Sequence, residues 1–354
     1  MKKSLIGFFA VLCFLTFSQS LVFATENSWT IMTPVPMQTY SSTAGATLLG
    51  DKIYFLGHNI NGLYDPATNK WTTMTPVPVD SVITTVVACR NRIYLICGNA
   101  TIPTQVYDPA TDTWENKTAI PTSRDLLQAC VVDDKIYLIG GRKLESYLYQ
   151  TLASDATDVY DPSTDSWSSM AVVPTAVAGY ASAVLDNKIY IIGGGVTAGG
   201  AQNASTLVQI FDPATNQWTN GASLPVGVFD ARACSTSGVL APKRIYVVGG
   251  MLTYNIRSQP IGTNMTQVYD PETDSWTVGA SMPTVRWGLG IAVVDDEIYA
   301  IGGYNGYGLR FGLVIANEKY TPIGYIPEFS SWMITPLLLA TIVLVVYAKK
   351  RITT

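Results

Sequence analysis

Histidine and charge are scarce in this chain, and the common catalytic motifs are missing. A single histidine, His58, occurs in 354 residues, and only 14% of the residues are charged. The cysteines show no C-x-x-C spacing, which argues against a zinc site. No G-x-S-x-G, H-E-x-x-H or P-loop motif is present, so the sequence offers no recognisable residues for those hydrolytic or phosphate-binding chemistries. We therefore predict neither a metal nor a cofactor.

The two ends of the chain look like targeting and anchoring segments. Residues 1–24 contain two lysines, an apolar run and small residues before Ala24, which together predict a signal peptide cleaved after Ala24. An uncleaved anchor is the alternative. Residues 330–348 carry no charge and precede the basic tail 349–354, which predicts a transmembrane helix with a cytoplasmic tail. We expect an exported protein that its C-terminus anchors in the cell membrane, with the folded part outside.

The part of the chain between these ends is acidic. It holds all 26 acidic residues but only 17 of the 22 basic ones, so its net charge is −9, which argues against nucleic acid as a partner. Four cysteines remain after signal removal, and the sequence leaves their three possible pairings open. Four N-x-S/T sequons predict glycosylation on surface loops; they begin at Asn99, Asn116, Asn203 and Asn264.

Two motifs recur in step along the middle of the chain. The first reads "YDPATNKW" from Tyr64 to Trp71, and four further copies end in tryptophan. The second contains an Ile-Tyr pair, a hydrophobic run and usually Gly-Gly. Its six copies begin at Asp51, Asn91, Asp134, Asn187, Lys243 and Asp296. A period of roughly 40–60 residues indicates a repeat architecture.

Each repeat is consistent with four short strands. The continuous hydrophobic run of the Ile-Tyr strand predicts burial on both faces, and the Asp-Pro pair predicts the turn before the tryptophan strand. Six such units predict an all-β, six-bladed propeller over residues 25–322. The Gly-Gly, Tyr-Asp and Trp at these offsets resemble kelch repeats, and the resemblance covers roughly residues 27–322. We expect the motif aromatics to pack between blades, so that they specify the fold rather than the function.

The sixth copy of the first motif starts at Tyr320 and never reaches a tryptophan. Just after the predicted cleavage site, however, the chain reads "NSWTIMTPVP", which matches "NKWTTMTPVP" after the first copy. We predict that the strand containing Trp29 pairs with the strand ending at Tyr320. The two termini would then close the ring and leave no open sheet edge.

The candidate ligand residues lie on connections between blades. In propellers of this type, these connections open on the same face as the loops after Gly-Gly, which are long in blades three to six. Arg124 and Arg286 occupy matching positions, Arg232 is displaced by four residues, and Trp287 is an extra tryptophan. Arginines and aromatics suit carboxylates and sugars, so we predict that these four residues bind ligand. The alternative for Arg124 and Arg286 is that they brace the blades through backbone carbonyls.

The kelch resemblance raises two enzyme classes. Enzymes resembling galactose oxidase hold copper with two histidines and tyrosines, which a chain with one histidine cannot supply. Sialic-acid mutarotases are six-bladed kelch propellers, and Arg124 and Arg286 would suit their carboxylated sugar. A membrane-anchored propeller with long loops fits a non-catalytic cell-surface module for protein binding, glycan binding or adhesion better. A sugar-modifying enzyme resembling the mutarotases is the alternative, and a closed channel pocket with both arginines would favour it.

Residues 323–329 form the predicted linker to the apolar segment. They end in Pro327, Glu328 and Phe329, directly before that segment. This tripeptide in this position resembles the PEF-type sorting signal of archaeal surface proteins. The resemblance implies a sortase-type processing step that replaces the helix with a lipid, whereas a retained helix would be a plain membrane anchor.

Overall fold

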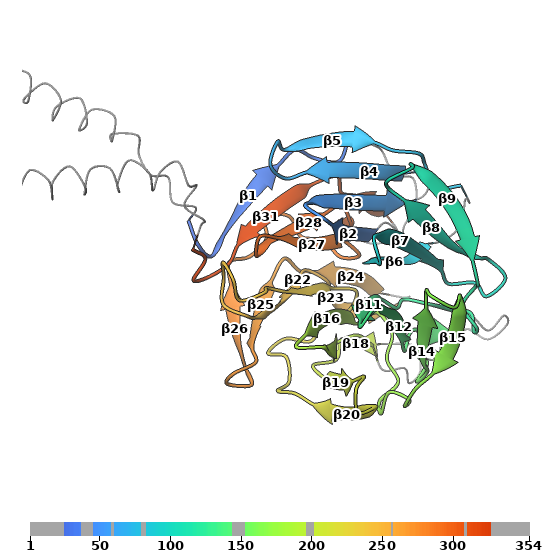
Figure 1. Ribbon diagram of the computed structural model, residues 1–354. Coiled ribbons are helices and arrows are strands. Elements are labelled where there is room, and N and C mark those ends of the chain that lie inside the picture. The colour runs from blue at the N-terminus through green and yellow to red at the C-terminus, as the bar shows by residue number, and fades with distance from the viewer. Residues whose placement is uncertain are drawn as a thin grey trace, which may run out of the picture. The chain divides into compact units, whose positions relative to one another are not determined.

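The repeats fold into six four-stranded antiparallel sheets arranged in a ring (Figure 1). This computed structural model describes residues 25–36, 45–57, 60–78, 83–143, 153–195, 202–255, 258–307 and 310–326. The ring belongs to one compact unit, Asn27–Tyr325. The expected all-β, six-bladed propeller is confirmed.

Each of five blades is built from one continuous segment of the chain, and the sixth takes its outermost strand from the N-terminal end. Blade one comprises β2 (Gly45–Leu49), β3 (Lys52–Gly57), β4 (Ile60–Asp65) and β5 (Lys70–Thr73). Blade two comprises β6 (Ile83–Cys89), β7 (Arg92–Cys97), β8 (Thr104–Asp108) and β9 (Thr113–Lys117). Blade three comprises β11 (Ala129–Val132), β12 (Lys135–Ile139), β14 (Thr157–Asp161) and β15 (Ser166–Ser169). Blade four comprises β16 (Ala181–Leu185), β17 (Lys188–Ile192), β19 (Val208–Asp212) and β20 (Gln217–Asn220). Blade five comprises β21 (Arg232–Ser235), β22 (Ile245–Val248), β25 (Thr266–Asp270) and β26 (Ser275–Gly279). Blade six comprises β27 (Gly290–Val294), β28 (Glu297–Ile301), β31 (Asn317–Thr321) and β1 (Ser28–Met32).

The second strand of each blade forms the core, as its continuous hydrophobic run predicts. The isoleucine of every Ile-Tyr pair has no exposed surface, because neighbouring blades cover both faces of its strand. The innermost strands contact one another in ring order, from β2 through β6, β11, β16 and β21 to β27 and back. Side-chain hydrogen bonds join several of them; Thr47 Oγ1 and Thr85 Oγ1, for example, accept from the next blade at 3.0 and 2.9 Å.

The two ends of the propeller meet in blade six. β1 pairs antiparallel with β31, with Trp29 opposite Tyr320 and Ser28 opposite Thr321. The predicted closure is therefore confirmed. Because β1 starts where β31 ends, both ends of the chain leave the ring on one face, here called the terminal face. The opposite face is called the loop face.

A repeated contact, here called the clasp, joins the outer rims of neighbouring blades. In the clasp between blades one and two, Trp114 Nε1 lies 3.0 Å from the carbonyl oxygen of Thr75, and Asp112 Oδ1 lies 2.9 Å from the Thr75 nitrogen. Tyr107 Oη also donates to Asp112. The other five clasps join Trp29 and Asn27 to Ala280, Trp71 and Asn69 to Thr33, Trp167 and Asp165 to Thr118, Trp218 and Asn216 to Ala171, and Trp276 and Asp274 to Ala222.

The clasp explains why the repeated motif alternates between Asp and Asn before its tryptophan. The Asn or Asp of each clasp has φ between 47° and 55°. This is a left-handed conformation that Asn and Asp adopt more readily than most other residues. Either side chain supplies the required oxygen acceptor. Asn27 and Trp29 thus provide the missing end of the sixth motif.

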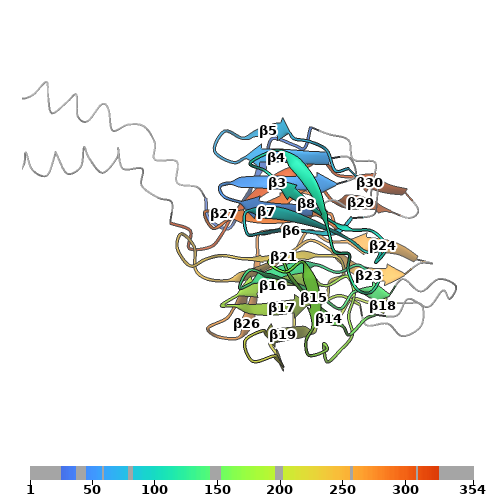
Figure 2. The same ribbon diagram turned by 45° about the vertical axis from the view of Figure 1, so that its right-hand side comes forward.

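The long loops of blades three to six add small sheets to the loop face, and Figure 2 shows those of blades four to six along its right-hand side. β10 (Arg124–Asp125) pairs with β13 (Arg142–Lys143), and β29 (Tyr304–Tyr307) pairs with β30 (Arg310–Leu313). β18 (Gln202–Asn203), β23 (Met251–Asn255) and β24 (Ser258–Gly262) form a third sheet that joins the loops of blades four and five.

Several predictions concern residues outside the described part of the chain. They are the signal peptide 1–24, His58, the Pro327–Glu328–Phe329 motif, the helix 330–348 and the tail 349–354. Within the described ranges, no helix is long and apolar enough to cross a membrane.

Candidate functional site

Arg124 and Arg286 occupy equivalent places in blades three and six, as their spacing predicts, but each is fully buried within its own blade. Arg124 Nη1 donates to the carbonyl oxygens of Gly140 and Ala156, and Nη2 pairs with Asp158.

Arg286 repeats this arrangement in blade six. Its Nη1 donates to Gly302 and Ala316 at 3.1 and 2.9 Å, and its Nη2 lies 2.8 Å from Glu318 Oε2. Burial lowers the pKa of Arg286 to about 10, and Glu318 opposes this shift. These contacts are the ones expected if the two arginines brace the blades through backbone carbonyls. Ligand binding by the two arginines stays a prediction.

Blades four and five replace this ion pair with an uncharged arrangement. Val177 and Val228 take the place of the arginine, and Gln209 and Gln267 take the place of the carboxylate. Each glutamine instead hydrogen-bonds both backbone groups of the incoming connection; Gln267, for example, binds Val226 at 3.0 Å through both its Oε1 and its Nε2. The arginine and its acid therefore occur together or are replaced together, as expected of a buried pair.

Trp287 packs inside the loop face rather than projecting from it. Only 5% of its surface is exposed, and it forms an apolar cluster with Phe229 and Met251, against which Leu126, Ala204 and Tyr304 pack. Trp287 therefore packs against other side chains of the loop face. Its role as a ligand contact stays a prediction.

Arg232 is the only one of the four predicted residues that is partly exposed. Its Nη1 lies 3.1 Å from Asp230 Oδ1, and both side chains keep 19% of their surface exposed. Burial raises the pKa of Asp230, and Arg232 opposes that shift. A half-buried carboxylate with a single neighbouring cation thus lies on the loop face.

Asp230 belongs to a row of backbone hydrogen bonds that runs around the mouth of the central channel. The N–H groups of Gly179, Asp230 and Gly288 donate in turn to the carbonyl oxygens of Leu126, Gly179 and Asp230, at 2.7, 2.6 and 2.9 Å. Leu126, Gly179, Asp230 and Gly288 all have φ between 51° and 62°. Asp230 therefore adopts a left-handed conformation at a position that glycine fills in the two adjacent blades.

Tyr304 borders the same place from β29. A Cβ atom on Gly288 would lie 3.1 Å from Asp230 Oδ2 and 3.5 Å from the Tyr304 ring, so both side chains approach this glycine closely. Tyr304 Oη is buried and has no hydrogen-bond partner among the described residues. Burial raises the pKa of the Tyr304 hydroxyl, and Asp230 adds to the shift. We call Asp230, Arg232 and Tyr304 the mouth cluster.

Gln128 links three blades beside the mouth cluster. Its Nε2 donates to the carbonyl oxygens of Tyr180 and Ala231, and its Oε1 accepts from Ser182. In blade three, Arg142 forms a two-pronged ion pair with Asp125 through Nε and Nη2. The rim of the mouth thus differs in chemistry from blade to blade.

The mouth cluster offers groups that both donate and accept hydrogen bonds. Asp230 Oδ2 can accept, whereas the remaining N–H groups of Arg232 and the hydroxyl of Tyr304 can donate. Amides and hydroxyls match this mixture. No group of three or more potential metal ligands occurs in the described residues.

A prediction based on arginines and an extra tryptophan does not include Asp230 and Tyr304, although both stand at positions that the repeat pattern marks. Counting five residues from the proline of each connection gives Leu126, Gly179, Asp230 and Gly288, which singles out the aspartate. Tyr304 directly follows the Gly-Gly of blade six, a position that the repeat pattern also marks.

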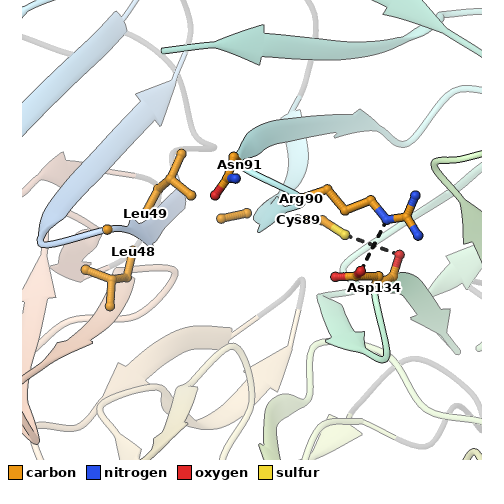
Figure 3. A pocket seen from close by; sticks show the side chains of 8 residues that line it. Leu48, Leu49, Cys89, Arg90, Asn91 and Asp134 are labelled. Carbon is orange, nitrogen blue, oxygen red and sulfur yellow. Dashed lines mark hydrogen bonds and ion pairs between the residues drawn. The ribbon is translucent and has the colours of Figure 1, made fainter. Parts of the chain in front are cut away.

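The terminal face carries a separate cavity of about 650 Å³ beside the tight turns of blades one to three. Figure 3 shows Leu48 and Leu49 on one side of it and Cys89, Arg90 and Asp134 on the other. Arg90 Nε lies 3.4 Å from Asp134 Oδ2, and the Cys89 thiol donates to the Asp134 carbonyl. This ion pair is the counterpart, on the opposite face, of the pair in the mouth cluster.

The predicted modification sites differ in their surroundings. Asn116 is exposed on β9 and Asn99 is exposed in a loop, whereas Asn264 Nδ2 donates to the Met282 carbonyl at 2.7 Å. The backbone of Asn203 lies in β18, and its glycosylation, like that of the other three, stays a prediction. Cys89, Cys130 and Cys234 are free thiols in this structure.

Comparisons with known proteins agree with this fold. Kelch-like protein 15 of Danio rerio is 35% identical over 172 residues, which are 43% of this chain and 27% of that protein. Spermatocyte protein spe-26 of Caenorhabditis elegans is 29% identical over 174 residues, or 49% of this chain and 28% of that protein. The chain therefore spans little more than a quarter of the length of these relatives.

The fold also matches solved structures. The structure of YjhT superposes with a TM-score of 0.64 and 16% identity, covering 81% of this chain and 96% of YjhT, a likeness that shows the fold alone. A family model, the KLHDC2/KLHL20/DRC7 Kelch-repeats domain, matches residues 83–303, which is more than half of the chain. This chain belongs to that kelch-repeat family.

Proposed function

We propose that this kelch propeller is a non-catalytic binding module, anchored at the cell surface by its C-terminus, that recognises a protein through its loop face. The observation that carries the proposal is that the chain ends and the added loops lie on opposite faces of the propeller. The chain ends leave from the terminal face, and the added sheets of blades three to six lie on the opposite face together with the mouth cluster. Anchoring through the terminal face would present this surface away from the membrane.

The chemistry of the mouth cluster supports a binding role. Asp230 and Arg232 are partly exposed and can engage amide groups, and the surrounding loops provide a surface larger than a small-molecule pocket needs. Apolar side chains are also exposed on this face: Ile261 keeps 51% of its surface exposed and Val285 keeps 40%. A protein partner could use both kinds of contact.

A sugar-modifying enzyme has less support. A closed channel pocket with both arginines would favour that alternative, but Arg124 and Arg286 are buried in separate blades, where each pairs with a carboxylate and donates to backbone carbonyls. A glycan ligand of a non-catalytic module is the other outcome that the experiment distinguishes.

The test compares two ion pairs on opposite faces. In one variant, Asp230→Asn and Arg232→Gln alter the mouth cluster; in the control, Arg90→Gln and Asp134→Asn alter the pair at the terminal-face cavity. Surface proteins that bind the wild-type propeller are identified, purified and measured individually by calorimetry, and the same three propellers are applied to a glycan array.

We expect the mouth variant to lose at least tenfold in affinity for the purified protein, and the control variant to bind like the wild type. Equal loss in both variants, or none in either, would contradict the assignment to the loop face. Saturable glycan binding that only the mouth variant loses would replace the protein ligand with a glycan.

A further inference from the structure

Blade five has an unusual connection on the terminal face. In the other blades a tight turn joins the first two strands, as at Asp133–Asp134 or Asp186–Asn187. Between β21 and β22, the chain instead makes a longer excursion over residues 236–244, here called the blade-five insert. Because this connection joins the same ends of the strands as the tight turns do, the insert lies on the face from which the chain ends leave.

A buried carboxylate holds the insert in place. Asp296 of blade six is 3% exposed and accepts hydrogen bonds from the backbone N–H groups of Ser237, Val239, Leu240 and Ala241. The Ser237 hydroxyl adds a further bond at 3.0 Å. Successive N–H groups converging on one anion form a nest, which fixes the backbone of the insert.

The insert displays an aliphatic side chain that is largely exposed to solvent. Val239 keeps 78% of its surface exposed although its backbone is fixed. The segment after β31 lies beside the insert, since a Cβ atom on Gly324 would be 3.0 Å from both Pro242 Cγ and Pro242 Cδ. Next to that glycine, Ile323 is 44% exposed. Two aliphatic side chains are thus exposed where the chain leaves the propeller.

The length of chain beyond this point limits how far away a membrane can be. Only four residues separate Tyr325 from Ser330, where the predicted membrane segment begins. At about 3.3–3.6 Å per residue, even a fully extended connection holds Tyr325 within about 20 Å of that segment. The part of the terminal face nearest to Tyr325 must then lie close to the lipid headgroups.

The tight turns of the terminal face carry exposed aspartates, whereas the blade-five insert carries an exposed aliphatic side chain. These aspartates are Asp51, Asp133, Asp134, Asp186 and Asp295. Approach of these carboxylates to an anionic lipid surface would be repulsive. The blade-five insert instead presents Val239. Lys243, which lies in the same insert, pairs with Asp186 at 2.6 Å.

We propose that Val239 and Ile323 contact the lipid surface and tilt the propeller toward blade five. The proposal rests on the C-terminal anchoring in the proposed function. Exposed aliphatic side chains gain free energy at the interface between headgroups and acyl chains. Their contact would fix the direction in which the loop face is presented, which a tether alone cannot do.

The experiment places a polarity-sensitive fluorophore on a cysteine at one of three positions in the full chain. The test variants are Val239→Cys and Ile323→Cys. The control is Val278→Cys on β26 of the same blade, which is 62% exposed. Cys234 is partly exposed, so it is replaced by serine in every labelled chain, as is Cys13. Cys89, Cys97 and Cys130 are buried, and burial raises the pKa of Cys89 and of Cys130 to about 11.

The labelled chains are reconstituted into phosphatidylcholine vesicles with brominated acyl chains. We expect quenching at positions 239 and 323 to exceed that at 278 at least threefold. If the protein floats with the vesicles but all three positions are quenched equally, the lipid contact is wrong and the anchor stands. If the protein does not float with the vesicles, both the anchor and the contact are wrong.

Discussion

The outer rim and the mouth of the same propeller follow opposite rules. At the rim, six clasps repeat one arrangement, in which a tryptophan and an Asn or Asp hold both backbone groups of a residue in the preceding blade. At the mouth, one equivalent position holds Leu126, Gly179, Asp230 and Gly288 in successive blades. The repeated contacts at the rim therefore hold the ring together. The residues at the mouth differ from blade to blade, and this variation marks the surface that can acquire a binding function.

Removing the closing strand should have the largest effect on the rim. Deletion of Glu26–Pro36 removes β1, the clasp to Ala280 and the partner of β31. The smaller change Trp29→Ala should cost less than the roughly 3–5 kcal/mol typical of a fully buried aromatic residue, because Trp29 is only half-buried. We expect the deletion to abolish the cooperative thermal transition and Trp29→Ala to lower the melting temperature. An unchanged melting temperature in the deletion variant would contradict closure by β1.

The rim was also the part that the sequence could predict. The aromatic and turn residues act through local rules, and Trp29 could be matched to Tyr320 because each repeat needs a fourth strand. The mouth could not be predicted in the same way, because the burial of Arg124, Arg286 and Trp287 depends on how each loop folds over its neighbour. Matching spacing correctly made the two arginines equivalent, but it could not tell whether their guanidinium groups face solvent or the blade interior.

Breaking the buried ion pair inside blade three should have the next largest effect on stability. Arg124→Val leaves the Asp158 carboxylate buried without its cation, which should cost about 3–5 kcal/mol in unfolding free energy. Adding Asp158→Gln recreates the Val and Gln combination of blades four and five. We expect the double variant to recover most of the loss in chemical denaturation. A double variant as unstable as the single one would show that these blades are not interchangeable.

Acid should weaken half of the clasps and spare the others. Hydrogen bonds from Tyr107 and Thr75 lower the pKa of Asp112, and those from Ala222 and Tyr269 lower the pKa of Asp274. Burial acts in the opposite direction at Asp165, but bonds from Tyr160 and Thr118 still lower its pKa. Because the folded pKa lies below the unfolded one, this stabilisation is complete above the unfolded value and is lost as the pH falls through the folded value.

Replacing these three aspartates by asparagine keeps the acceptor and removes the titration, as Asn27, Asn69 and Asn216 already do in the other clasps. We expect the triple variant to lose less stability than the wild type between pH 7 and pH 3 in urea denaturation. The difference should be smaller than the effect of breaking the ion pair. Parallel losses in both proteins would exclude the clasps as the acid-sensitive element.

The smallest effect on stability is expected at the mouth. Asp230→Asn keeps an oxygen acceptor for Arg232 and removes a charge whose burial is unfavourable, so unfolding free energy should change by no more than about 1 kcal/mol. Asp134→Asn on the terminal face provides the matched control in the same denaturation measurement. A loss of several kcal/mol in Asp230→Asn would mean that Asp230 belongs to the scaffold instead.

The closure of blade six also sets an order of events during biosynthesis. β1 is among the first folded segments to be synthesised, but its partner β31 is among the last, nearly three hundred residues later. Until β31 emerges, β1 has an unpaired edge, and no earlier intermediate can complete the ring. An aromatic strand must therefore be kept from pairing with other chains until almost the whole propeller has been synthesised.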